Sequence, residues 1–285
     1  MQRHPMPFNK KNSLILVAVL TLVLACAPES QDSVDGGSVT TVVSLPRMAD
    51  GTPNLNGIWQ ALNEANWNLE PHGASQGPVY ALGAQFSVPP ALGVVKGESI
   101  PYLDGALAQR DENFSKRITM DPEIKCFMAG IPRSTYLPYP FQVIQSDSDI
   151  LLAYQFAGAV RQINMGEPTA AVIPSWMGWS NGRWENDTLV IDVTGLNGNW
   201  LDRAGNYYSG SAMVTERYTL LSPNLLQYEA TIEDSSVYSE PWTLTLPLYR
   251  RQDANMQLLE YKCPVFAEEA MYGDLRKEPM ENTLH

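Results

Sequence analysis

Two pairs of neighbouring acidic and basic residues are the polar side chains of this sequence best suited to chemistry. Asp202 and Arg203 lie in W-L-D-R-A-G-N-Y-Y, where a turn between strands is expected, and Glu216 and Arg217 lie in T-E-R-Y. Because side chains alternate along a strand, Glu216 and Arg217 point to opposite faces, and one of them points inward. An inward charge needs a partner, so it belongs either to a structural ion pair, which is preferred, or to a ligand anchor.

Acid and base catalysis is a second use for such residues. Arg161 in V-R-Q-I and Asp192 in V-I-D-V-T lie in strand-like runs and are open to the same two interpretations. A buried aspartate near Tyr208 would supply a general acid or base for an isomerase, dehydratase, cyclase or hydrolase. The candidate catalytic residues are therefore Asp202, Arg203, Glu216 and Tyr208.

Histidine, the usual proton carrier of enzymes, is nearly absent. His4 lies in the N-terminal leader, His285 ends the chain, and only His72 remains, in the loop P-H-G-A-S. A Ser-His-Asp triad would have to use His72, and no serine has the glycine pattern of a nucleophile elbow. The count excludes a centre of two or three histidines, and the cysteines lack a nearby histidine for zinc. We expect no metal and no other cofactor.

Aromatic rings concentrate in W-M-G-W-S-N-G-R-W. Trp176 and Trp184 would share a face of one continuous strand, with Trp179 on the opposite face. Rings of this kind line cavities for apolar or sugar-like molecules, and they serve equally well as core packing. The predicted ligand-binding residues are Trp176, Trp179, Arg161 and Arg217, with core packing as the alternative for the rings.

Short strands are the elements expected to position these residues. After residue 140, apolar-rich runs alternate with turn residues, which predicts strands in a meander. The runs cover residues 141–145, 150–156, 159–165, 176–184, 188–194, 213–221, 225–232, 242–249 and 257–261. So many sequential strands predict an all-β antiparallel domain, and closure into a barrel removes its exposed edges. Asn186-Asp187 suits a tight hairpin, whereas Pro247 requires an edge or a bulge.

The segments that flank the strands have a different character. Residues 51–138 are rich in Gly, Pro, Asn and Ser, which indicates a long irregular wrap with one short helix near residues 105–114. After Cys263, apolar residues and the stop signal Gly273 predict a short amphipathic helix. In an oxidising compartment Cys126 and Cys263 are predicted to form a disulfide, and two separately buried thiols are the alternative.

Two sets of residues resemble known families. N-G-I-W at 56–59 resembles the Gly-x-Trp strand of lipocalin-like barrels, and Arg250 or Arg251 resembles the arginine that covers that tryptophan. K-C-F-M-A-G-I-P-R, M-G-W-S-N-G-R-W-E-N-D-T-L-V-I-D-V-T-G and P-W-T-L-T-L-P-L-Y-R-R resemble an uncharacterised family of exported bacterial proteins, over most of residues 50–277. The resemblances imply an up-and-down, lipocalin-like barrel. Where family members carry histidines after the D-R-x-G turn, this chain has Tyr207, Tyr208 and Met213, which argues against histidine-dependent chemistry.

The N-terminus has the pattern of a signal peptide. Arg3, Lys10 and Lys11 precede an apolar run that is too short to span a bilayer. V-L-A-C at 23–26 resembles the lipobox of bacterial lipoproteins, which implies a lipid on Cys26, and Ala27 resembles a signal for the outer membrane. Ordinary secretion is the alternative. The predicted organisation is a signal peptide at 1–25, a flexible tether at 26–47 and a barrel domain at 48–285, with strands mainly in 140–262.

Charge restricts the partners. The formal net charge is −12, and the three cations of the leader would leave with it. Because no Lys/Arg cluster of useful size exists, nucleic-acid binding is excluded. The preferred function is a cell-envelope lipoprotein, facing the periplasm, that binds a small apolar or amphipathic molecule. The alternatives are an enzyme of the same shape and a structural or assembly lipoprotein whose barrel is filled by its own side chains.

Overall fold

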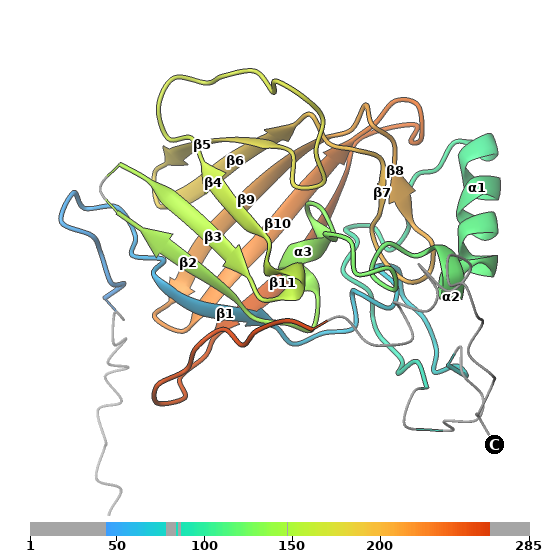
Figure 1. Ribbon diagram of the computed structural model, residues 1–285, viewed down its shortest axis with the longest axis horizontal. Helices are drawn as coiled ribbons and strands as arrows, with labels where there is room; N and C mark the ends of the chain where they lie inside the picture. Colours follow the sequence, from blue (N-terminus) through green and yellow to red (C-terminus); the bar gives the residue numbers. More distant parts are fainter. Residues whose placement is uncertain (1–43, 78–83, 85–86, 147, 263–285) are drawn as a thin grey trace, which may run out of the picture. The chain divides into compact units, whose positions relative to one another are not determined.

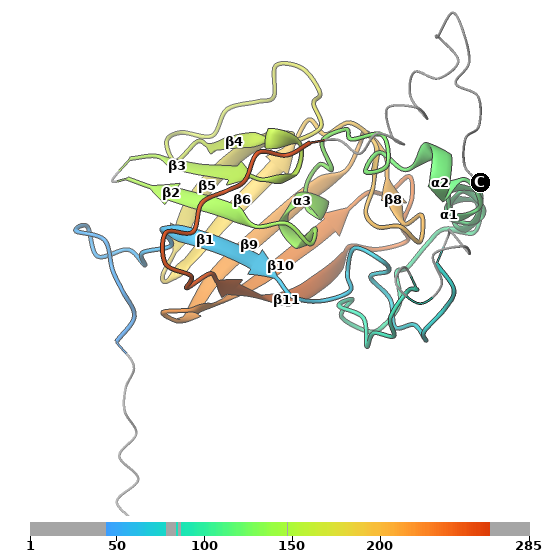
Figure 2. The ribbon, with the colours of Figure 1, turned by 60° about the horizontal axis from the view of Figure 1, so that its bottom comes forward.

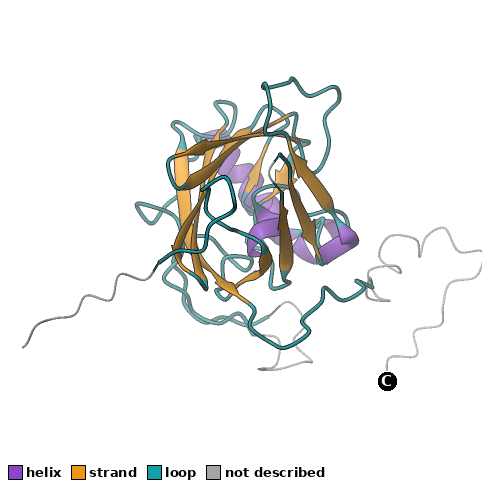
Figure 3. Cartoon of the chain, turned by 90° about the vertical axis from the view of Figure 1, so that its left-hand side faces the viewer, coloured by secondary structure: helices purple, strands orange, loops and turns teal. Residues whose placement is uncertain are grey.

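Nine strands form one antiparallel sheet that curls into a nearly closed barrel (Figure 1, with an end-on view in Figure 3). The computed structural model describes residues 44–77, 84, 87–146 and 148–262. The strands are β1 (Gly57–Ala61), β2 (Phe141–Gln145), β3 (Ile150–Tyr154), β4 (Val160–Ile163), β5 (Trp179–Glu185), β6 (Thr188–Thr194), β9 (Met213–Ser222), β10 (Leu225–Glu233) and β11 (Trp242–Arg250). Their order is β4-β3-β2-β1-β11-β10-β9-β6-β5, which confirms the predicted all-β up-and-down barrel and is compatible with the lipocalin-like type.

The two ends of the sheet, β4 and β5, meet through a short parallel contact. The backbone N–H of Asn164 donates to Ser180 O at 3.0 Å, and Gly182 N donates to Asn164 O at 2.8 Å. The Asn164 Nδ2 also donates to Asn181 Oδ1 at 2.9 Å. A ring with an odd number of strands cannot alternate in direction throughout, so one junction has to be parallel. Here that junction is brief and is reinforced by two amide side chains.

Alternation along the strands fills the interior. In β10 every second residue is buried, and β9 follows the same pattern from Val214 to Leu220. Glu216 is fully buried while Arg217 is partly exposed, so the predicted opposition of these two side chains is confirmed. Large rings from Phe141, Tyr218 and Tyr228 lie inside with at most 1% of their surface exposed. The interior is therefore packed with the chain's own side chains.

Trp59 and Arg250 contact each other at the end of the barrel where β11 terminates. These residues are register partners on β1 and β11, and the guanidinium carbon of Arg250 lies 4.3 Å from the centre of the Trp59 ring. The indole Nε1 donates to Leu55 O at 2.9 Å. Of the two predicted arginines, Arg250 thus covers the tryptophan, while Arg251 donates to Gln60 Oε1 at 2.7 Å. A cation over an indole face is a favourable contact.

The other end is covered by the irregular wrap (Figures 1 and 2). This end carries α1 (Asp104–Ser115), α2 (Arg117–Met120), α3 (Arg133–Tyr136) and the two-stranded ribbon of β7 (Asn199–Trp200) and β8 (Tyr207–Tyr208). All four residues of α3 are buried. Isolated bridges from Val95 to Leu244 and from Tyr102 to Tyr238 attach the wrap to β11 and its preceding turn. The predicted wrap and its helix near 105–114 are thus present.

Several predicted bounds differ from the structure. β5 begins at Trp179 because residues 165–178 form a loop, and residues 257–261 form no strand. Pro247 pairs with Gln227 of β10, whereas β1 ends opposite Leu248, so this proline behaves like an edge residue. The predicted leader, most of the tether and the C-terminal helix lie outside the described residues.

The folded domain begins before the predicted tether ends. Arg47 donates to both carboxylate oxygens of Asp187, at 2.8 and 2.7 Å, in the turn between β5 and β6. The described residues belong to one compact unit, Val43–His285. Within the described ranges, no helix combines the length and apolar character needed to cross a bilayer.

Candidate functional site

A buried ion pair crosses the barrel interior. Arg161 points inward from β4 and Glu216 points inward from β9, and their side chains are 2% and 0% exposed. Nη2 of Arg161 donates to Oε2 of Glu216, while Nε donates to Ser180 Oγ at 2.7 Å. Burial opposes the charged guanidinium, but the Glu216 carboxylate outweighs it and raises the pKa of Arg161. The two side chains are therefore held in one geometry.

Two tyrosines complete the hydrogen bonding of Glu216. The hydroxyls of Tyr218 and Tyr228 donate to Oε1 of Glu216 at 3.0 and 2.8 Å, and their ring centres lie 4.9 Å apart. Burial, together with the negative charge of Glu216, raises the pKa of both phenols well above the ordinary value. Both hydroxyls thus remain protonated donors. With Arg161 on its other oxygen, the carboxylate has three donors and a matched charge.

Two polar atoms beside this network form no hydrogen bond of good geometry among the described residues. These are Nη1 of Arg161 and the hydroxyl of Tyr154, which belongs to β3. Both side chains are about 97% buried, with 3% exposure for each residue. Burial raises the pKa of Tyr154, although the Arg161 charge lowers it in part, so the hydroxyl remains neutral. Contacts of the Tyr154 hydroxyl with Thr135 and Arg161 also lower this pKa in part, so the hydroxyl lies beside both side chains.

A second buried network lies in the wrap, around Arg133 of α3. Arg133 donates to both oxygens of Asp121 at 2.7 and 3.0 Å and to Glu123 Oε2 at 2.8 Å. Arg203 also binds Glu123, at 2.9 and 2.6 Å, and its guanidinium lies 4.2 Å from the centre of the Trp67 ring. Burial raises the pKa of Glu123, but the two arginines outweigh burial and lower this pKa below its ordinary value. The network holds the wrap to α3 at the barrel end.

Asp202 connects two segments of the same wrap through hydrogen bonds. Its carboxylate accepts hydrogen bonds from Leu69 N at 2.9 Å, Asn206 N at 3.1 Å and Asn206 Nδ2 at 2.6 Å. It is fully buried, and this burial raises its pKa to about 6 despite those three donors. Tyr208 is buried nearby in the ribbon, and its hydroxyl has no partner in the described part of the chain.

The structure separates the four candidate catalytic residues. Glu216 lies inside the barrel, whereas Asp202, Arg203 and Tyr208 belong to the wrap and the β7–β8 ribbon. Asp202 accepts from Leu69 and Asn206, the Tyr208 hydroxyl has no hydrogen-bond partner among the described residues, and Arg203 faces Glu123. Glu216 is therefore set apart from the other three candidates.

The predicted ligand-binding residues are also dispersed. Only Arg161 points into the barrel. Trp179 is 39% exposed and donates to Thr169 Oγ1 at 2.9 Å, and Trp176 lies in the preceding loop with its ring 5.5 Å from Phe127. Arg217 lies on the outer face and donates to Glu185 Oε2 at 2.9 Å. Asp192 is likewise on the outer face, where it binds Thr215 at 2.9 Å, so the inward interpretation of Asp192 is wrong.

Sequence reasoning missed the residues that complete the interior network. Ser180, Tyr218 and Tyr228 each lie on the inward face of a strand whose alternation was visible, so assigning the inward face of each strand would have identified them. Tyr154 is likewise inward on β3. Arg133 carries no such signal, because it lies in an irregular segment without periodicity.

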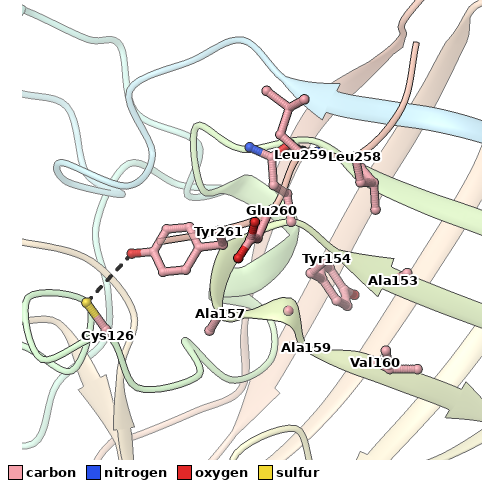
Figure 4. Close-up of a pocket in the computed structure, with 12 residues that line it drawn as sticks. Cys126, Ala153, Tyr154, Ala157, Ala159, Val160, Leu258, Leu259, Glu260 and Tyr261 are labelled. Atoms are coloured by element: carbon pink, nitrogen blue, oxygen red, sulfur yellow. Dashed lines mark hydrogen bonds between the residues drawn. The ribbon is translucent and has the colours of Figure 1, made fainter. Parts of the chain in front are cut away.

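An apolar groove of about 540 Å³ lies outside the barrel (Figure 4). It runs between the end of the β3–β4 hairpin and residues 258–261 of the chain after β11. Most of the lining is aliphatic or aromatic, with Ala153, Val160, Leu258, Leu259 and Tyr261 as the main contributors. Its polar groups are Gln155, Glu260 and the hydroxyl of Tyr261, which lies 3.8 Å from Sγ of Cys126.

Cys126 borders this groove and is disulfide-bonded. The other cysteines of the chain, Cys26 and Cys263, both lie outside the described residues. The pairing of Cys126 with Cys263 therefore stays a prediction. Tyr261 packs beside the bonded cysteine, with its ring 4.7 Å from Phe156 and 5.6 Å from Tyr139. These three rings pack together, and of the three Tyr261 lines the groove.

No protein-family model matches this chain, and searches of curated proteins and of solved structures find no similar protein. Within the part of the chain that the structure describes, no three His, Cys, Asp or Glu side chains are grouped so that they would hold a metal ion.

Proposed function

We propose that this chain is a lipid-anchored protein of the bacterial cell envelope that binds a small apolar or amphipathic molecule in the groove beside Cys126, not in the barrel lumen. The observation that carries the proposal is the contrast between the two spaces. The lumen is occupied by buried rings, whereas the groove has about 540 Å³ and a mainly apolar lining with a few polar groups. That volume and composition are typical of small-molecule sites.

Binding is favoured over catalysis by the state of the candidate acids and bases. Glu216 is paired with Arg161 and already accepts hydrogen bonds on both oxygens. Asp202 is engaged by three N–H donors in the wrap. Neither borders the groove, whose only lining carboxylate is Glu260 within the described residues. A single carboxylate beside aliphatic side chains orients a ligand more readily than it supplies acid and base together.

A structural or assembly role is the second candidate, and the filled lumen favours it. Barrels that carry ligands inside leave space between their inward side chains, whereas here the rings of Phe141, Tyr218 and Tyr228 are at most 1% exposed. In that case the groove would have no small-molecule occupant. The two candidates share the envelope location and differ in the use of the groove.

Binding to a neutral fluorescent naphthylamine probe tests the groove. Leu259 lines it and is 69% exposed, so Leu259→Glu places a charge there without disturbing the core. Leu92→Glu is the matched control, because Leu92 is 94% exposed and lies elsewhere. We expect about tenfold weaker probe binding for Leu259→Glu alone, since a charge in an apolar site is costly. Equal affinity in both variants would favour the assembly role.

Mass spectrometry tests the anchor. The full chain is expressed in a bacterium and its N-terminal peptide is analysed. The lipobox pattern predicts a mature chain that begins at Cys26 and carries acyl groups. Cys26→Ser should abolish the acylation and release the protein from the membrane fraction. An unmodified Cys26 in a secreted chain would instead support ordinary secretion.

A further inference from the structure

We infer that the corner at which α1 meets α2 is a docking surface for an anionic lipid membrane. Five large apolar side chains make up this surface, which is called the apolar corner below: Phe114, Ile118, Met120, Phe127 and Met128. None of them lines the groove proposed above, so the inference goes beyond that site and does not depend on it.

Apolar surface is left uncovered at this corner. The five side chains are each between 38% and 49% exposed, although all of them fall within residues 114–128. α1 ends at Ser115 and α2 begins at Arg117, so the chain turns here, at the outer end of the wrap (Figures 1 and 2). None of the four residues of α2 is buried. Exposed apolar side chains that gather in one place are typical of a surface that contacts a membrane or another molecule.

Two cations lie against these apolar side chains. The guanidinium carbon of Arg117 lies 4.1 Å from the centre of the Phe114 ring, and Nζ of Lys125 lies 3.5 Å from Sδ of Met120. Among the described residues, neither cation is paired with a carboxylate. Long cationic side chains beside exposed apolar groups suit a membrane interface, because their stems stay in the apolar layer while their charges reach the headgroups.

The acids near the corner are neutralised within the protein. Asp121 and Glu123 lie in the same segment, but both are buried and form ion pairs with Arg133. On α1, Asp111 and Glu112 are each paired with a cation of the same stretch, and the other acid of this helix lies in its first turn, at the opposite end. The corner therefore presents positive charge, although the formal net charge of the chain is −12.

This combination fits an anionic bilayer better than a second copy of the chain. A two-fold contact would place each corner against itself, so Arg117 and Lys125 would face the same two cations of the other copy. Like charges that meet across an interface oppose association. An anionic lipid surface instead strengthens binding by about fivefold for each nearby Lys or Arg. It also accepts exposed rings and aliphatic side chains into its headgroup region.

Vesicle sedimentation tests the surface. The full chain with Cys26→Ser, recovered from the soluble fraction of its host, is the background of every protein, so that no acyl group on residue 26 contributes. Vesicles of phosphatidylcholine are compared with vesicles that also contain phosphatidylglycerol. We expect sedimentation with the anionic vesicles only, and less of it at high salt, because salt screens the attraction. Arg117→Glu and Ile118→Asp should each weaken this binding by about fivefold or more.

Matched variants separate the corner from general effects. Lys96→Glu makes the same charge change as Arg117→Glu at an exposed lysine outside the corner, and it should bind like the parent protein. Leu221→Asp is the control for Ile118→Asp, because Leu221 is 52% exposed and lies on β9. Arg117→Lys keeps the charge and should keep the binding. Near-ultraviolet circular dichroism checks that each variant is folded.

Two results would overturn the inference. One is the absence of binding to anionic vesicles by the parent protein, or equal binding by Arg117→Glu and Lys96→Glu. The other is a dimer in analytical ultracentrifugation that Ile118→Asp dissolves, without vesicle binding, which would assign the corner to a second copy. Leu259→Glu should leave vesicle binding unchanged, so the groove proposal and this inference fail separately.

Discussion

Arg161 on β4 and Glu216 on β9 form a buried ion pair although 55 positions separate them in the sequence. Across the parallel junction of β4 with β5, strands β5 and β6 lie between β4 and β9, so the contact runs through the interior and not along neighbouring strands. It joins the two sides of the seam at which the barrel closes. In the described barrel interior, the charge of each side chain is therefore balanced only by the charge of the other.

The ion pair predicts a strong coupling between two substitutions. Arg161→Met or Glu216→Gln alone leaves one buried charge without its partner, and each should cost about 3–5 kcal/mol of unfolding free energy. Arg161→Met with Glu216→Gln should cost much less than the sum of the two. Urea unfolding of the four proteins measures the coupling. Additive losses would mean that the charges do not interact in the folded protein.

Asp202 predicts a dependence of stability on pH. Its pKa is about 6 in the folded protein against an ordinary 3.8, because burial disfavours the carboxylate. The folded state therefore binds the proton more tightly than the unfolded state. This proton binding stabilises the folded protein fully below pH 3.8, and the stabilisation is lost as the pH rises through 6. This loss lowers the free energy of unfolding by roughly 3 kcal/mol. Asp202→Asn should remove it.

Glu123 changes the stability of the protein with pH in the opposite direction to Asp202, so wild type has to be compared with Asp202→Asn. Arg133 and Arg203 lower the pKa of Glu123, so its contribution is lost as the pH falls. Unfolding of wild type and Asp202→Asn, measured from pH 4 to 7, isolates the Asp202 contribution as the difference between them. Parallel curves over this range would contradict the assignment.

The conformation of Gly57 predicts that a larger side chain at this position would disturb the Trp59–Arg250 contact. Its φ is +141°, a conformation that other residues rarely adopt, and a Cβ there would overlap Nη1 of Arg250. Gly57→Ala should therefore destabilise the protein by about 1–3 kcal/mol, as strained backbone does. Gly105→Ala, in α1 with open space around it, is the control and should be neutral or stabilising. Equal thermal midpoints for the two variants would exclude the link.

The bonded Cys126 predicts a specific partner. If Cys126 and Cys263 are joined, Cys126→Ser and Cys263→Ser should each cost about 2–5 kcal/mol, and the double variant should cost no more than either one. Non-reducing peptide mapping should recover the two segments as one cross-linked species. A cross-link between Cys126 and Cys26 would refute both the pairing and the lipid anchor.

The strands could be predicted from sequence wherever one of their faces is buried. β2 and β6 have the predicted bounds, and the hairpin at Asn186 forms because asparagine tolerates its φ of +54°. Alternation also predicted that one of Glu216 and Arg217 points inward, and the structure shows that it is Glu216. In contrast, β5 begins late because the loop before it binds the outer face through Thr169 and Asn181, a contact that no periodicity indicates.

The partners within the site could not be predicted in the same way. Alternation places Arg161 inside but does not reveal that closure of the barrel brings it to Glu216. Arg133 and Asp121 meet in the wrap, where no repeating pattern assigns a face to either side chain. Pairing of this kind depends on the closed three-dimensional arrangement, so it appears only once the strands are placed.

The pairing of β1 with β11 also determines when this domain is able to fold. Asn56 and Arg250, which contact each other beside the first strand, are 194 positions apart. The barrel cannot close until nearly the whole chain has been synthesised and released, because the last strand is the neighbour of the first. Closure over such sequence distances is slow in small proteins. A newly made chain thus keeps its inward rings uncovered until β11 is available to pair with β1.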